Sequence, residues 1–166
     1  MSRTIHIDLM DSSSIDRAIR ELRDYPRWIE RKAGELAQRL AEYGLARVEM
    51  GYAAALYDGD KDVDVTVEKR DENAYAIVAS GATVLILEFG AGVTYGSGHP
   101  QAGEFGYGPG TYPGQTHAMN PKGWWFTGSD GESHHSYGNV PSMVMYITGI
   151  ELEQEVERIA KEVFRS

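Results

Sequence analysis

Residues 86–100 read ILEFGAGVTYGSGHP, and their character changes at Glu88-Phe89-Gly90 from an aliphatic run to a glycine-rich segment. Glycine accounts for 19 of the 166 residues, well above the roughly 7% that is average for proteins. Because glycines and prolines recur as far as Gly138, residues 90–138 are predicted to form one long loop, with room for a single short strand at Trp124-Trp125-Phe126. A connection of this length is expected either to be functional or to become ordered against a partner.

Upstream of this loop, the apolar residues follow first a helical and then a strand period. They recur at helical spacing on both sides of Pro26, so we expect two helical segments over residues 12–44, joined by a kink at the proline and ended by Gly44. From Arg47 onward, apolar and polar residues alternate. This period of two predicts an antiparallel β-meander of three strands over residues 47–80, the first of them running from Arg47 to Tyr57.

Two further helices are expected, one on each side of the loop. Residues 82–89 are too short for periodicity to separate a helix from a strand, and the helix is favoured because leucines dominate. Residues 140–165 carry a long apolar stripe, with Asn139 as a possible cap and Pro141 in the first turn. The sequence therefore predicts one α+β domain spanning residues 1–166: N-terminal helices, an antiparallel β-meander with a further short strand, a long glycine-rich loop and a C-terminal helix.

Composition excludes several classes of protein. The formal charge of −9 argues against a domain that grips nucleic acid by neutralising phosphates. The absence of cysteine excludes disulfides and thiolate chemistry. The first residues lack the apolar core of a signal peptide, and no run of about 18 apolar residues suggests a membrane span. We expect a soluble protein that is made in the cytoplasm and does not contact a membrane.

No constellation in the sequence has the spacing of a known catalytic, cofactor or metal site. Four of the five histidines and two acids gather in the loop, but none stands at a spacing such as H-E-x-x-H that would aim two ligands at one ion: His99, His117, His134, His135, Asp130 and Glu132. The glycine clusters lack the form of phosphate-binding loops. We therefore predict no catalytic residue, no metal and no cofactor, and interpret the histidines as solvated.

The aromatic residues of the loop are the stronger signal. Exposed rings among glycines are unfavourable on the surface of a monomer but make good anchors for a neighbouring subunit. They are Tyr95, Phe105, Tyr107, Tyr112, Trp124, Trp125, Phe126 and Tyr137.

The order of motifs along the chain resembles one family of viral proteins. A D-G turn and a V-x-V-x-V-E strand precede Tyr75-Ala76-Ile77-Val78-Ala79-Ser80-Gly81 and the E-F-G-x-G-V motif at 88–93; a loop with His99-Pro100 and Trp124 follows, and then Gly138-Asn139-Val140-Pro141-Ser142-Met143 and a final helix. This collinear set resembles the neck proteins of long-tailed bacteriophages. The type is the head-tail joining or tail-completion protein named after gene product ten of a lambda-like coliphage, in the form common in prophages of Gram-positive anaerobes. The chain departs from the family at Ala91, where threonine is usual.

The resemblance implies an α+β subunit without an active site. In that family the subunits form a ring, expected here to be a hexamer, between the head connector or stopper protein and the tail terminator or tail tube protein, and DNA passes through the lumen without specific binding. The location implied is the neck of the virion, assembled in the host cytoplasm. By match to the motif, Glu88, Phe89, Gly90 and Gly92 would brace the start of the loop, and the segment around Trp124 would be interface.

Two other readings stay open on the sequence. The chain could be a different virion part, such as a tail terminator or a minor tail protein, which would also form oligomers but bind other partners. It could also be a metal-dependent hydrolase that uses His117, His134, His135 and Glu132.

Overall fold

The computed structural model describes residues 12–93, 98–107, 119–128 and 130–165 of the chain. Its elements confirm the predicted α+β class, with a helix at each end and two small antiparallel sheets between them. In chain order the elements are α1 (Ser12–Ala54), β1 (Asp64–Asp71), β2 (Ala74–Ser80), α2 (Val84–Phe89), β3 (Trp124–Thr127), β4 (Ser133–Ser136) and α3 (Val144–Arg165).

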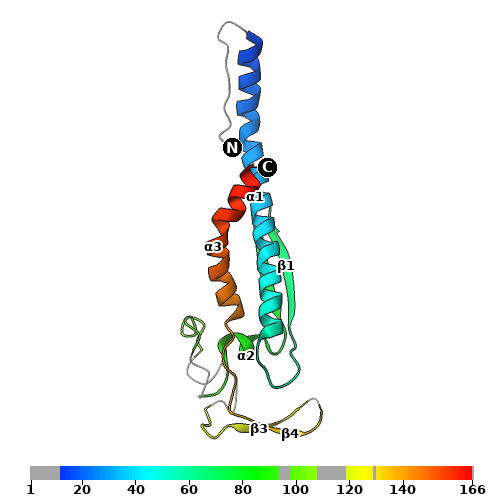
Figure 1. The fold of residues 1–166 in the computed structure, drawn as a ribbon, viewed down its shortest axis with the longest axis vertical. Coiled ribbons are helices and arrows are strands. Elements are labelled where there is room, and N and C mark those ends of the chain that lie inside the picture. The colour runs from blue at the N-terminus through cyan, green and yellow to red at the C-terminus, as the bar shows by residue number, and fades with distance from the viewer. Residues whose placement is uncertain (1–11, 94–97, 108–118, 129, 166) are drawn as a thin grey trace.

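The molecule is elongated and α1 forms its axis (Figure 1). α3 packs beside the C-terminal part of α1, and the β1–β2 hairpin packs against the same part of α1 from another side. α2 lies below them, and the β3–β4 hairpin forms the end of the molecule opposite the N-terminus of α1 (Figure 1). The N-terminal part of α1 extends beyond the end of α3.

α1 corrects the first part of the sequence prediction. One helix of 43 residues replaces the two segments over 12–44, and Pro26 lies inside it. The expected strand from Arg47 to Tyr57 is also wrong, because the helix continues to Ala54. Val48, Tyr52 and Ala55, at a spacing of four and three, are the buried side chains of this region. All three fit a helical period, whereas only Val48 and Tyr52 also fit the period of two seen in the sequence. Their burial in the core favours the helix.

Gly44 does not end the helix as predicted, because its role is to allow close packing. A Cβ atom at Gly44 would collide with Ile77 of β2 and lie 3.2 Å from Leu152 of α3. A Cβ atom at Gly51 would lie 2.5 Å from Val144, the first residue of α3. The two glycines therefore let α1 approach both of its neighbours closely. α1 ends further on, where Nζ of Lys61 donates to the carbonyls of Tyr52 and Ala53, a favourable place for a cation.

The predicted three-stranded meander is a two-stranded hairpin. β1 and β2 pair antiparallel in a register that sets Val65 opposite Ala79 and Val67 opposite Ile77. Val65, Ile77 and Ala79 pack on the core together with α1, on which this face of the hairpin lies. The core consists of residues from α1, α2 and α3 and the segments beside them: Val48, Tyr52, Ala55, Val84, Leu87 and Val144.

The later elements agree more closely with the sequence. α2, at Val84–Phe89, confirms the short helix predicted over 82–89. β3 confirms the strand expected at Trp124-Trp125-Phe126, whereas its partner β4 was not predicted. α3 starts at Val144 rather than at residue 140. Asn139 is not its cap, because it lies five residues before the first helical residue; its backbone forms a bridge to Ala91.

Salt bridges reinforce the contact of α1 with α3. The guanidinium of Arg47 donates to both carboxylate oxygens of Glu151, at 2.6 and 2.5 Å. This hydrogen bond and the charge of Arg47 lower the pKa of Glu151. Nearer the end of α3, Arg39 lies 3.7 Å from Glu162, and the rings of Trp28 and Phe164 meet edge to face with their centroids 5.8 Å apart.

We predict that Gly51→Ala destabilises the fold by about 1–3 kcal/mol, because the new methyl group meets Val144 across the packed junction of α1 and α3. Gly149→Ala is the matched control, since Gly149 lies in α3 and a Cβ atom there meets nothing within 4 Å. The control should raise the free energy of unfolding by roughly 0.5–1 kcal/mol through helix propensity. Urea denaturation followed by circular dichroism measures both, and equal effects of the two substitutions would contradict this account of Gly51.

Candidate functional site

The carboxylate of Glu88 joins the end of α2 to the start of α3. Its Oε2 accepts a hydrogen bond from the backbone N–H of Met145 at 2.9 Å, and its Oε1 accepts one from the N–H of Tyr146 at 3.0 Å. The first amides of a helix have no acceptor within the helix, and an acidic group there is favoured by the helix dipole. Glu88 is only 5% exposed. It is therefore a buried cap of α3, although it lies 57 residues before Met145 in the sequence.

The backbone of α2 completes this junction. The amide of Ser142 donates to the carbonyl of Leu87 at 2.7 Å, and the amide of Met143 donates to the carbonyl of Glu88 at 3.3 Å. Met143 adopts a φ of 52°, a left-handed conformation that costs a residue with a side chain on the order of 1 kcal/mol or more. The hydrogen bonds on both sides of Met143 hold the chain in this turn, which aims α3 along α1.

His99 lies against the same carboxylate. Its Nε2 is 3.2 Å from Oε1 of Glu88, and the residue is 5% exposed. The imidazole also packs on the ring of Phe89, with centroids 4.4 Å apart, and meets the ring of Tyr146 edge to face at 5.3 Å. The prediction that the loop histidines are solvated is therefore wrong for His99, which anchors the described part of the loop to α2 and α3.

Phe89 is the centre of an aromatic cluster that includes two rings of the loop. Tyr107 stacks obliquely on it, with centroids 4.2 Å apart, and Phe105 lies at 5.7 Å. Phe89 is 8% exposed, whereas Phe105 is 59% exposed. The cluster thus has a buried base formed by Phe89 and an outer edge formed by Phe105.

The two ends of the loop are closed by contacts between backbones. Ala91 and Asn139 form an antiparallel bridge with N–H to O distances of 2.9 and 2.8 Å. Gly90 and Gly138 flank the bridge at φ values of 77° and 112°. A Cβ atom at Gly90 would lie 2.7 Å from the carbonyl oxygen of Asn139, and one at Gly138 would collide with the carbonyl of Ala91. Gly92 lies in the same clasp, beside the carbonyl of Tyr137. Glycine is required here by both conformation and space.

A groove of about 560 Å³ opens beside this junction, between β2, α2 and α3. Its walls are mainly apolar and include Val78, Leu85 and Ile150, with Glu153 at its margin. Tyr52 lies at its base, and the phenol oxygen is buried with no hydrogen-bond partner among the described residues. Burial, and to a smaller extent the charge of Glu88, raise the pKa of Tyr52.

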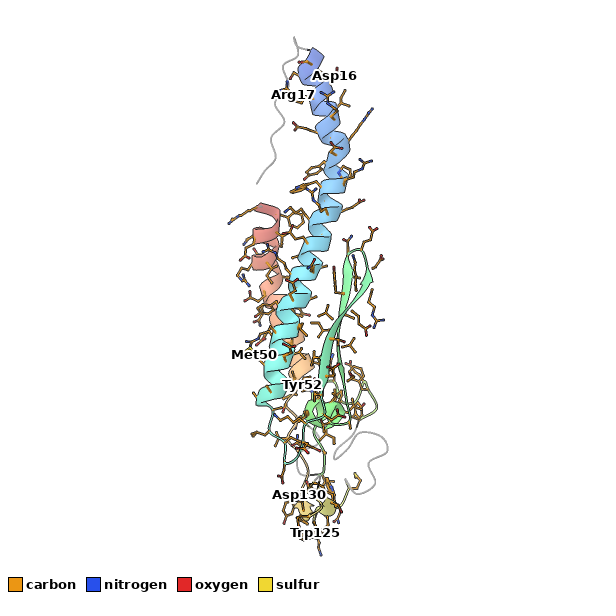
Figure 2. All side chains as sticks on the ribbon, turned by 90° about the vertical axis from the view of Figure 1, so that its right-hand side faces the viewer. Asp16, Arg17, Met50, Tyr52, Trp125 and Asp130 are labelled. Carbon is orange, nitrogen blue, oxygen red and sulfur yellow. The ribbon has the colours of Figure 1, made fainter. Side chains whose placement is uncertain are left out.

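The predicted interface residues of the β3–β4 hairpin divide between its two faces. Trp124 and Phe126 are half-buried and line a small cavity of about 120 Å³ against the body of the protein. Trp125 points to the other side and is 68% exposed. It meets the ring of His135 at 4.9 Å, and His135 meets Tyr137 at 4.7 Å. The three rings make an exposed aromatic ladder at one end of the molecule, where Figure 2 labels Trp125.

Of the predicted site residues, the structure brings Glu88, Phe89, Gly90, Gly92 and Tyr107 together at the base of the loop. The β3–β4 residues Trp124, Trp125 and Phe126 form a separate group. Tyr95 and Tyr112 lie outside the described residues. Their assignment to a subunit interface stays a prediction for all ten.

The histidines proposed as metal ligands do not converge in the described part of the chain. His134 and His135 are neighbours on β4 and so point to opposite faces. His134 binds Asp130 at 2.9 Å. The pKa of Asp130 is lowered by the backbone N–H of Glu132 and by His134. No group of three or more potential ligands lies close enough to hold a metal among residues 12–93, 98–107, 119–128 and 130–165, and His117 is not among them.

Comparisons with protein-family models, with curated proteins and with solved structures found no match for this chain. The likeness to phage neck proteins therefore rests on the sequence motifs. In the part of the chain that the structure describes, none of the helices has the length and apolar composition needed to cross a bilayer.

We predict that Glu88→Ala lowers the free energy of unfolding by about 2–4 kcal/mol, because it leaves the partly buried amides of Met145 and Tyr146 without acceptors. Glu88→Gln keeps one oxygen and the side-chain volume, so its effect should be about half as large. Glu49→Ala, at an exposed acid of α1, serves as the control and should change stability by less than about 0.5 kcal/mol.

Urea denaturation and hydrogen exchange measure this prediction together. In Glu88→Ala the amides of Met145 and Tyr146 should exchange faster than those in the middle of α3. If exchange at the start of α3 is unchanged, Glu88 is not the cap of this helix.

Proposed function

We propose that this chain is a structural subunit of the neck of a long-tailed bacteriophage, where copies of it form a ring that completes the tail and joins it to the head connector. The observation that carries the proposal is the distribution of exposed apolar side chains on an elongated molecule. Two sets lie toward its two ends (Figure 2), and further exposed apolar side chains, such as Met50, Leu85 and Ile150, lie between them.

One set lies on the part of α1 that extends beyond α3, where Ile19 is 42% and Leu22 59% exposed. The other lies on the β3–β4 hairpin and the loop, where Trp125 is 68%, Tyr137 57% and Phe105 59% exposed. Large apolar groups gathered at sites with few intramolecular contacts are typical of surfaces that bind other proteins. Two such surfaces at opposite ends suit a subunit that contacts neighbours on several sides.

The motif that resembles the one in neck proteins lies at the base of the loop. Glu88, Phe89, Gly90 and Gly92 bind the loop's two ends to α2 and α3. This arrangement supports the role that the resemblance implies for these residues, which is to brace a long segment that contacts other subunits. The loop would then gain contacts on assembly that offset the ordering cost of roughly 1–2 kcal/mol per residue.

The acidic balance of the chain suits a channel for DNA. A lumen with negative charge repels the phosphate backbone, so DNA slides through it without being held. The net charge of −9 supplies this character without a specific nucleic-acid site. The proposed partners are other copies of the chain, the head connector or stopper protein, and the tail terminator or tail tube protein.

Electron microscopy of particles made without this protein tests the proposal. Filled heads and finished tails that remain unjoined are the expected result. Tails of uncontrolled length would instead indicate a tail terminator, and normal particles would contradict a role in the neck.

We predict that Trp125→Ser lowers the yield of joined particles at least about tenfold in a complementation assay, because it removes an exposed anchor of the aromatic ladder. The stability of the free subunit should change by less than about 0.5 kcal/mol, since Trp125 is mostly exposed. Lys122→Ala, at an exposed residue of the same end, is the control and should support normal joining. If Trp125→Ser supports joining as well as Lys122→Ala does, Trp125 is not part of the interface.

A further inference from the structure

Among residues 12–93, 98–107, 119–128 and 130–165, no other helix or strand packs on the N-terminal part of α1, where Ala18 is buried and the larger aliphatic side chains are exposed (Figure 1). The contact of Trp28 with Phe164 lies near the last residue of α3, Arg165, and the helix continues for more than ten residues toward Ser12 beyond it (Figure 1). Residues 12–25 span about 20 Å at the helical rise of about 1.5 Å per residue. We call residues 12–25 the extension of α1.

The extension carries an apolar stripe of coiled-coil type. Ile15, Ile19, Leu22, Pro26 and Ile29 follow one another at alternating spacings of four and three residues, with Ile19 and Pro26 at a positions and the others at d positions. The four aliphatic side chains are between 37% and 59% exposed. Further along α1 the same face packs on the rest of the molecule, so the stripe continues a packing surface past the end of the body.

A helix of this length needs a partner. The extension continues α1 and needs no separate nucleation, but Pro26 removes one hydrogen bond at its base. Exposing Ile15, Ile19 and Leu22 adds the cost of keeping aliphatic groups in water.

The charges beside the stripe favour one kind of partner. Arg20, Arg23, Arg27 and Arg31 form a row at spacings of three and four residues, with Asp16 and Asp24 four residues to either side of Arg20. Arg20, Arg23 and Arg27 make no ion pair among the described residues. In a parallel pair of α1 helices, the heptad sets Ala18 of one copy opposite Arg23 of the other, so no acid meets the row. Parallel pairing of α1 with α1 therefore leaves these cations without an acidic partner.

α3 offers the complementary surface. Ile150 and Glu153 line the groove beside β2 and α2, and Val156 and Glu157 continue the same side of the helix at helical spacing. Ile150 and Val156 are each 40% exposed. Glu153 has no ion-pair partner within the described residues. Glu157 is paired with Lys161 of the same helix at 2.5 Å. This strip combines apolar side chains with acids, as the extension combines them with arginines.

We propose that the extension of α1 docks into the groove of a second copy of this chain, with its aliphatic stripe on Ile150 and Val156 and its arginine row beside Glu153 and Glu157. The contact is heterologous, because one end of each copy meets a different surface of the next, and repetition of such a contact around an axis closes a ring. The inference rests on the self-assembly in the proposed function and adds which surfaces meet.

Cysteine cross-linking tests the contact directly, since the natural chain has no cysteine. Leu22→Cys and Val156→Cys chains of different size are purified separately, mixed, and treated with a short bis-maleimide, both in solution and in particles that contain the protein. A heterodimer band between the two chains is expected. Leu22→Cys alone, at the same concentration, should give at least about tenfold less cross-linked dimer.

Two results would overturn the proposal. Dominant cross-linking of Leu22→Cys to itself would show that α1 pairs with α1. The second such result would be that residues 1–11 cover the stripe of their own chain. In that case Ile7→Cys with Leu22→Cys would cross-link within one chain, deletion of residues 1–11 would increase association, and the Leu22–Val156 product would be missing.

Charge exchange gives an independent measurement. Ile19→Glu should weaken self-association on the order of tenfold or more in sedimentation analysis, because it sets an acid against the acidic strip. Arg17→Ala changes the net charge by the same amount, lies outside the stripe, and should have little effect. Glu153→Lys with Glu157→Lys should also weaken association, and Arg20→Glu with Arg23→Glu in the other copy should restore it.

These outcomes separate the inference from the function on which it rests. Rings that form and join heads to tails with no Leu22–Val156 cross-link, and with Ile19→Glu as competent as the natural chain, would contradict the docking while leaving the neck function intact. Particles that join normally without the protein would contradict the function itself.

Discussion

A buried carboxylate at the end of α2 supplies the hydrogen-bond acceptors that the first turn of α3 lacks. Glu88 receives the amides of Met145 and Tyr146, and the carbonyls beside it receive those of Ser142 and Met143. Without these acceptors, the start of α3 would be buried against α2 with its donors unpaired, at a cost of about 1–3 kcal/mol for each group. Because α3 in turn packs along α1, the position of one side chain determines where the second long helix begins and in which direction it runs.

The same junction explains why the loop is rich in glycine at its ends. The chain enters the loop at Gly90 and leaves it at Gly138. The two chain segments pass so closely that Gly90 lies against the carbonyl of Asn139, and Gly138 against the carbonyl of Ala91. The bridge between Ala91 and Asn139 then closes the loop at its base. His99 and Phe89 add a side-chain layer above the bridge. The described parts of the loop are therefore tied to the fold at its base, and one face of the β3–β4 hairpin lines a small cavity against the body while Trp125 on the other face is exposed.

Local patterns predicted the α+β class, α2, the strand at Trp124-Trp125-Phe126 and most of α3, since each has a period or composition that its neighbours do not disturb. They failed where contacts between residues far apart in the sequence determine the local structure. Val48 and Tyr52 fit both a strand and a helix, and only packing against Val144 and Leu87 selects the helix. Gly44 looks like a helix end until Ile77 and Leu152 approach it from other elements. A single carboxylate inside the apolar run 84–89 was the available signal for the cap, but its partners lie 57 and 58 residues away.

The elongated shape has a consequence for stability. Burial of Val48, Leu87 and Val163 stabilises the middle of the molecule, and the exposed side chains of the extension of α1 and of the β3–β4 hairpin gain little from it. A long helix that keeps Ile15, Ile19 and Leu22 in water is disfavoured unless another surface removes them from it. The aliphatic stripe, with a row of arginines beside it on a chain of net charge −9, is what a subunit needs if its final stability comes from an acidic neighbour of the same kind.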